Sequence, residues 1–311
     1  MSINYELKII CGLHRSGTTY TSKILSRSDS VQIIHEPCNP DWGVYGVNQW
    51  YPYLDPETND RRTKVLIDDI FHFRRRWNRQ PPRKLKLISH LFYKTVGGRQ
   101  GLIWSQLRLR HLLHSLPTVI CWKDPFVTFA LGHILPAYKA KAVCMIRHPG
   151  ALWYSNRKLN WTFDITRLLS QKTLVERYGN DISKKQWELA TPKSPASIAI
   201  LWKIMARMIS EQMSLLPSLI AVRHEDLCVQ TTDTTGKICD HLNIPFSKPM
   251  QQYIGKTTSG SSIEASQGIV HSFNRNSRHI INSWKKNISI KEERIIRDVI
   301  GEDFEKFYES W

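Results

Sequence analysis

The sequence has few of the features that mark secreted, zinc-binding or membrane-spanning proteins. Its six cysteines are scattered without C-x-x-C spacing, and most lie in apolar runs, so we expect reduced thiols and no metal site. No uncharged run approaches the roughly 18 residues of a spanning helix. An apolar strand begins at Leu7, which leaves no room for a signal peptide, so we expect a cytoplasmic protein.

The sequence also lacks a Pro/Gly/Ser-rich linker, so one domain over residues 1–311 is the simplest prediction. Its charge, by contrast, is uneven. Residues 61–116 contain fourteen Lys or Arg against Asp68 and Asp69, a local excess of twelve within a net charge of +17. We therefore expect a basic helical insertion at residues 55–116, whose charge suits nucleic acid, a membrane surface or an acidic substrate.

Five short runs rich in β-branched residues each end in a polar signature, which predicts parallel strands whose carboxyl ends meet at one site. The runs are Leu7 to Cys11, Val31 to Ile34, Thr118 to Trp122, Ala142 to Ile146 and Leu219 to Val222. Helical patterns separate them, and Ser289 with Glu292 forms a capping box before a final helix. The pattern predicts a three-layer α/β domain around a central parallel sheet.

The segment Gly12-Leu13-His14-Arg15-Ser16-Gly17-Thr18-Thr19 has the glycine spacing of a phosphate-binding loop. It follows a predicted strand and precedes a predicted helix, so backbone N–H groups and the helix dipole would meet one anion. An ATP-using loop carries Lys after the second glycine, where Thr18 stands here, so an NTP hydrolase is disfavoured. The alternative is an ordinary turn capped by Ser16 or Thr18.

A second anion site is predicted after the fourth strand. Arg147 ends that strand, and Ser155 lies two turns along a helix opened by Pro149. A guanidinium fork and a hydroxyl suit a second phosphate, distinct from the one in the loop. A surface arginine and an exposed helical serine remain the alternative.

With these two motifs the chain resembles the PAPS-dependent sulfotransferases, which use 3′-phosphoadenosine 5′-phosphosulfate. The late Trp284-Lys285 resembles a further family segment, and the likeness spans most of the chain except the basic insertion. The resemblance implies a P-loop-like fold and a metal-free in-line displacement. It also implies that the loop, from His14 to Thr19, holds the 5′-phosphosulfate, while Arg147 and Ser155 hold the 3′-phosphate.

The resemblance assigns Lys123, after the third strand, to the sulfuryl group or bridging oxygen, with Arg15 beside it as a second cation. The base of small-molecule members is a His two positions after that lysine, where Pro125 stands here. Glu36 is the best candidate base, since Glu36-Pro37 resembles an element of bacterial and carbohydrate sulfotransferases. A structural ion pair at Glu36, and His35 or His14 as base, stay open.

The small, polar stretch from Gly255 to Gly268 is predicted to be flexible, within a C-terminal lid over residues 255–288. The resemblance places Arg275 and Ser277 on the 3′-phosphate. Aromatic residues after Glu36 predict a carbohydrate acceptor; they are Trp42, Tyr45, Trp50, Tyr51 and Tyr53. A sulfotransferase of small metabolites, a P-loop-like kinase and a nucleic-acid-binding protein are the alternatives.

Overall fold

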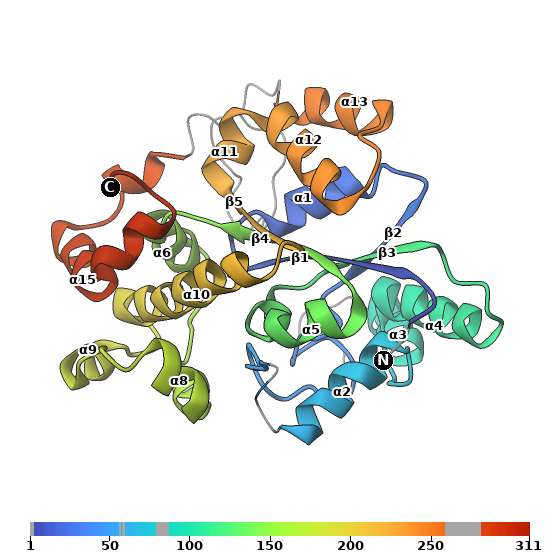
Figure 1. The fold of residues 1–311 in the computed structure, drawn as a ribbon, viewed down its shortest axis with the longest axis horizontal. Helices are drawn as coiled ribbons and strands as arrows, with labels where there is room; N and C mark the ends of the chain where they lie inside the picture. The colour runs from blue at the N-terminus through green and yellow to red at the C-terminus, as the bar shows by residue number, and fades with distance from the viewer. Residues whose placement is uncertain (1–2, 56, 58–59, 79–86, 259–280) are drawn as a thin grey trace. The chain divides into compact units, whose positions relative to one another are not determined.

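The protein was analysed as a computed structural model, which describes residues 3–55, 57, 60–78, 87–258 and 281–311 (Figure 1). Its strands are β1 (Glu6–Gly12), β2 (Val31–His35), β3 (Val119–Lys123), β4 (Lys141–Ile146) and β5 (Leu219–Arg223). They form a parallel sheet with the order β2-β3-β1-β4-β5. All five predicted strands are present, each within one residue of the expected bounds, and the α/β fold class is confirmed.

Helices fill the intervals that the sequence pattern assigns to them. The first group is α1 (Thr18–Leu25), α2 (Arg61–Phe71), α3 (Leu87–Val96), α4 (Gly98–Leu112), α5 (Leu131–Tyr138), α6 (Pro149–Lys158), α7 (Thr166–Leu169), α8 (Lys172–Tyr178) and α9 (Lys184–Leu189). The second group is α10 (Pro195–Leu215), α11 (His224–Val229), α12 (Thr231–Leu242), α13 (Lys248–Thr258) and α15 (Ile290–Ile300). The described residues also form the 3₁₀ helices η1 (Pro125–Ala130), η2 (Ser283–Lys286) and η3 (Gly301–Lys306).

The chain divides into two compact units, Met1–Cys11 with Asp29–Ala142, and Gly12–Ser28 with Val143–Trp311. A single domain therefore stays a prediction. In the first unit β3 pairs with both β1 and β2 in parallel, so that His35 lies opposite Lys123. The core beside these strands is aromatic, and the ring of Phe71 lies 4.4 Å from that of Trp122. The basic segment of this unit contains α2, α3 and α4, so its predicted helical character is correct.

The second unit is organised around the long helix α10, which lies beside α15 (Figure 1). Ser194 caps α10 and Pro195 occupies its first turn, as expected for a helix start. At the start of α15 the predicted capping box is present. The Ser289 hydroxyl accepts from the Glu292 backbone N–H, and the Glu292 carboxylate accepts from the Ser289 backbone N–H. Helix α1 lies against α13 in the same unit.

The prediction of a flexible stretch from Gly255 to Gly268 is partly wrong. Residues 255–258 belong to α13, which runs to Thr258. The Gly255-Lys256-Thr257 sequence is therefore helical and does not form a phosphate loop. The remainder of the predicted flexible stretch, and Arg275 and Ser277 with it, lie outside the described residues.

Candidate functional site

The loop between β1 and α1 has the backbone that its glycines predict. Gly12 has a φ of 122° and Gly17 a φ of 96°, both in the region that favours glycine. A Cβ on Gly12 would lie 2.2 Å from the carbonyl oxygen of Met145, so only glycine fits there. Arg15 is also left-handed, with a φ of 71°, a strained conformation of the kind that clusters at ligand-binding sites.

The start of α1 has no side-chain cap. The N-cap of α1 is Gly17, which has no side chain, so neither Ser16 nor Thr18 occupies the capping position. Both of these side chains are buried, and the N–H groups of the first turn carry the positive end of the helix dipole. This arrangement supports the prediction of a phosphate-binding loop.

Arg15, Arg147 and Ser155, which are far apart in the sequence, lie together in the second unit. The Arg15 Nε donates to the Ser155 Oγ at 3.1 Å. The Arg147 Nη1 donates to the Arg15 carbonyl at 2.7 Å, so Arg147 holds the strained residue of the loop. The backbone carbonyl of Arg147 in turn accepts from the Trp202 Nε1 at 2.9 Å.

The Nε of Arg147 is buried and has no hydrogen-bond partner within the described part of the chain. Burial also lowers the pKa of this guanidinium. An unsatisfied buried donor costs free energy and calls for an explanation. A phosphate oxygen would satisfy it, which fits the second anion site predicted at Arg147 and Ser155.

His224 lies against the loop, a contact that sequence reasoning missed. A Cβ on Gly17 would come within 2.8 Å of the His224 Cδ2, which explains why the loop has glycine there. Burial, together with the charges of Arg147 and Arg15, lowers the pKa of His224 well below its usual range. We therefore expect a neutral imidazole that adds no charge to the anion site.

Hydrogen bonds and an ion pair hold the rest of the turn around His224. Glu225 accepts hydrogen bonds from the backbone N–H of His148 at 3.1 Å and from the Tyr308 hydroxyl at 2.8 Å. Arg223 and Asp226 form a two-point pair, with both distances at 2.8 Å.

Trp161 is a second residue that sequence reasoning missed. Its ring lies 5.5 Å from the Arg15 guanidinium carbon, and the ring of His14 meets its edge at 6.3 Å. The Trp161 side chain is 40% exposed, so one aromatic face beside the loop meets solvent. In the sequence, Trp161 lies in Asn160-Trp161-Thr162, a pattern that gives no sign of a contact with the loop.

Trp284 supports the turn that follows β4. Its ring stacks on His148 at 4.3 Å, and a Cβ on Gly150 would lie 2.5 Å from it. Burial lowers the pKa of His148 to about 3, so this imidazole stays neutral. The predicted Trp284-Lys285 segment thus has a packing role next to Arg147.

In the first unit, Glu36 and Lys123 form an ion pair between the ends of β2 and β3. Lys123 is buried, and the Glu36 backbone N–H donates to its carbonyl at 2.8 Å. The other carboxylate oxygen of Glu36 accepts from the Asn39 side chain at 2.8 Å. His35 is close as well, with its Nε2 3.6 Å from the Glu36 Oε1.

Glu36 also has a positive φ, of 53°, so its backbone is strained as that of Arg15 is. The two predicted catalytic residues of this unit are thus in contact, and His35, the alternative base, is their neighbour. Lys123, the predicted catalytic lysine, is thus one ion-pair partner of Glu36.

Asp124, the residue after Lys123, has a structural role. Its carboxylate accepts from the backbone N–H groups of Cys38 at 2.7 Å and Phe126 at 3.0 Å, and it is fully buried. Burial raises the pKa of Asp124 to about 7. It fastens the chain after Glu36 to the start of η1. Over the described ranges, no cluster of three or more His, Cys, Asp or Glu residues could hold a metal ion.

The comparison with known families decides what these motifs belong to. A model of the sulfotransferase family matches residues 9–248, which include the loop, Glu36, Lys123, Arg147 and Ser155. The chain belongs to the sulfotransferase family. Sulfuryl transfer is therefore the general class of its reaction.

Several solved structures are similar at low identity. The sulfotransferase domain from the curacin biosynthetic pathway is 13% identical, with a TM-score of 0.47 over 96% of this chain and 98% of that one. Sulfotransferase STF9 from Mycobacterium avium is 11% identical, with a TM-score of 0.46 over 98% of this chain and 77% of that one. Mouse sulfotransferase SULT7A1, solved in complex with PAP, is 9% identical, with a TM-score of 0.42 over 97% of this chain and 84% of that one. No curated protein matches this chain.

Proposed function

We propose that the protein transfers the sulfuryl group of PAPS to an acceptor hydroxyl and releases 3′-phosphoadenosine 5′-phosphate (PAP). The observation that carries the donor assignment is the contact of Arg15, Arg147 and Ser155 beside the uncapped start of α1. It offers one anion site at the loop and a second at the buried, unpartnered Nε of Arg147. A donor with separate 5′ and 3′ phosphates would use both. Arg275 and Ser277 are proposed as further ligands of the 3′-phosphate.

In the proposed reaction Glu36 removes the proton of the acceptor hydroxyl as its oxygen attacks sulfur. The bond between sulfur and the bridging phosphate oxygen breaks, and the leaving oxygen keeps the electron pair. Arg15 and Lys123 then stabilise the negative charge that develops on the sulfuryl and leaving oxygens. Because Lys123 is paired with Glu36, it supplies a counter-ion before the proton moves. No metal ion is required by this scheme.

The nucleotide that the protein binds distinguishes a sulfotransferase that uses PAPS from a kinase that uses ATP. Calorimetry with PAP should give a measurable affinity, and ATP with Mg²⁺ should bind much more weakly. The reverse order would favour a phosphoryl transferase. Transfer of labelled sulfuryl from PAPS to an added acceptor, with formation of PAP, then tests the reaction itself.

We propose a carbohydrate hydroxyl as the acceptor. Glu36-Pro37 resembles the element of carbohydrate-acting members, and Trp42 and Tyr45 expose aromatic faces that suit sugar rings. Tyr51 and Tyr53 are buried and serve the core, so only part of the aromatic stretch can contact an acceptor. A small metabolite is the second candidate acceptor.

The acceptor class is tested by competition between glycans and small alcohols or phenols in the PAPS assay. We expect glycans to react faster, and Trp42→Ala with Tyr45→Ala to lower kcat/KM for them while PAP affinity is unchanged. Faster turnover of a neutral phenol would transfer the assignment to small-metabolite sulfation without affecting the donor.

A further inference from the structure

The outer face of α4 carries a stripe of leucines that the proposed chemistry does not use. The inner face packs through buried Trp104 and Leu107, and the Trp104 Nε1 donates to the Arg75 carbonyl at 2.9 Å. On the other side, Leu102, Leu109 and Leu113 are 39%, 57% and 66% exposed. Spacings of seven and four residues place these three side chains on one face. They therefore lie along one side of α4, where exposed Ser105 and Gln106 separate Leu102 from Leu109.

The stripe belongs to a larger group, which we call the leucine surface: Leu91, Phe92, Leu102, Leu109, Leu112 and Leu113. Helices α3 and α4, which carry it, pack against each other. Sixteen large apolar side chains are exposed in the described ranges, and six of them lie within the short segment of residues 91–113. Isolated exposed leucines need no explanation, but a concentration of this kind marks an interaction surface.

The charge around the leucine surface has one sign. Residues 70–122 contain eleven Lys or Arg and no Asp or Glu. On the described helices, Lys94, Arg99 and Arg110 are exposed. The partner must therefore be both anionic and able to accept apolar side chains.

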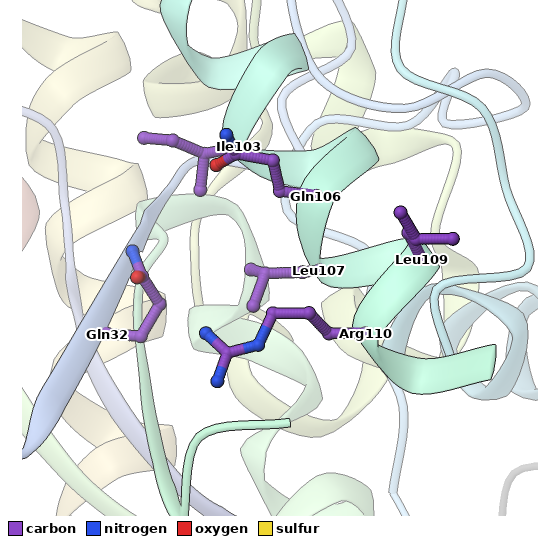
Figure 2. Close-up of a pocket in the computed structure, with 6 residues that line it drawn as sticks. All are labelled: Gln32, Ile103, Gln106, Leu107, Leu109 and Arg110. Atoms are coloured by element: carbon purple, nitrogen blue, oxygen red, sulfur yellow. The ribbon is translucent and has the colours of Figure 1, made fainter. Parts of the chain in front are cut away.

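A pocket of about 290 Å³ lies beside the stripe, between α4 and β2, which is an edge strand of the sheet. Figure 2 shows Leu107 and Arg110 extending from α4 toward β2, where Gln32 lies. Ile103 and Leu107 give the pocket apolar walls, while Gln32, Gln106 and Arg110 add polar groups. Such a lining suits a molecule with an anionic head and an apolar body.

We propose that the leucine surface docks the protein on an anionic lipid bilayer. The leucines and Phe92 enter the headgroup region, and Lys94, Arg99 and Arg110 pair with lipid phosphates. A nucleic acid or a sulfated polymer would use these cations but would leave the apolar side chains without a partner. No helix within the described ranges is long and apolar enough to cross a membrane. The proposal is independent of the acceptor assignment.

The test is sedimentation of the full chain with vesicles of phosphatidylcholine containing about one third phosphatidylglycerol, a composition with a negative surface potential. The triple variant L102Q/L109Q/L113Q should bind at least about tenfold more weakly, because three leucines no longer enter the bilayer. The matched control L169Q/L189Q/L215Q changes leucines that are 42%, 44% and 67% exposed, and it should bind as the wild type does. Vesicles of pure phosphatidylcholine should bind weakly.

The charge contribution is tested with Arg99→Gln and Arg110→Gln together. Each lost cation should weaken binding about fivefold, and the control K184Q/K185Q should have no effect. PAP affinity and melting temperature should be unchanged in every variant. Wild type that does not bind anionic vesicles, or an L102Q/L109Q/L113Q variant that binds them normally, would overturn the proposal. A third outcome would also overturn it. If the wild type self-associates without binding vesicles, and the L102Q/L109Q/L113Q variant does not self-associate, then the leucine surface binds a second copy of this chain.

Discussion

We propose two tasks for Arg147, and a single substitution can separate them. Its Nη1 holds the Arg15 carbonyl at 2.7 Å, and its buried Nε is available for the 3′-phosphate. Loss of a hydrogen bond between charged groups costs about 1.5 to 3 kcal/mol, or roughly 10- to 150-fold in affinity. Loss of the bond to the loop carbonyl should cost less, about 0.5 to 1.5 kcal/mol. Arg147→Ala should therefore weaken PAP binding strongly and binding of adenosine 5′-phosphate only modestly.

Calorimetry with both nucleotides measures the two effects, and the preference for PAP should fall at least about tenfold. Arg157→Ala is the control, because Arg157 lies on the same helix α6 but pairs with Glu292 instead. Ser155→Ala should give a smaller loss in the same direction. If Arg147→Ala weakens both nucleotides equally, then Arg147 acts only through the loop and the assignment of the 3′-phosphate is wrong.

Three further substitutions test the surrounding structure. Gly12→Ala should lower the free energy of unfolding by more than about 1 kcal/mol, because its φ is 122° and the Cβ would meet Met145; denaturant unfolding measures this. Trp161→Ala should weaken PAP binding about two- to fivefold in calorimetry, since a cation–π contact to Arg15 is lost, while the exposed position should leave the melting temperature unchanged. Asp124 has a pKa of about 7 in the folded protein against 3.8 for an ordinary Asp, so the stability of the wild type should fall as the pH rises from about 4 to about 7. Asp124→Asn should abolish this pH dependence, which urea titrations across that range measure.

Local patterns were enough to predict much of the fold. Strand ends and the loop from Gly12 to Thr19 follow from residue type and spacing, because glycine conformations and helix capping are decided within a few residues. The capping box at Ser289 was predicted for the same reason and is confirmed. The helix at residues 255–258 was missed because small polar residues have weak preferences that tertiary packing overrides.

The contacts of the site depend on residues far apart in the chain. The sequence predicted that Arg147 and Ser155 would share an anion, but not that Arg147 holds Arg15 or that Ser155 accepts from it. His224 and Trp161 were not assigned roles, since their positions against Gly17 and Arg15 are set by packing in the second unit. The sequence places His224 just after β5 and Trp161 just after α6, but it does not indicate that either residue lies against the loop.

The central claim is that Glu36 removes the acceptor proton in a sulfuryl transfer from PAPS. Glu36→Gln keeps the shape and the hydrogen bond to Asn39 but cannot accept the proton, and it leaves Lys123 without its counter-ion. The direct measurement is turnover of labelled PAPS with a reacting acceptor, alongside PAP affinity by calorimetry. We expect turnover to fall about 100-fold or more while PAP affinity stays within a few-fold. Near-normal turnover in Glu36→Gln would contradict the claim and transfer the role of base to His35 or His14.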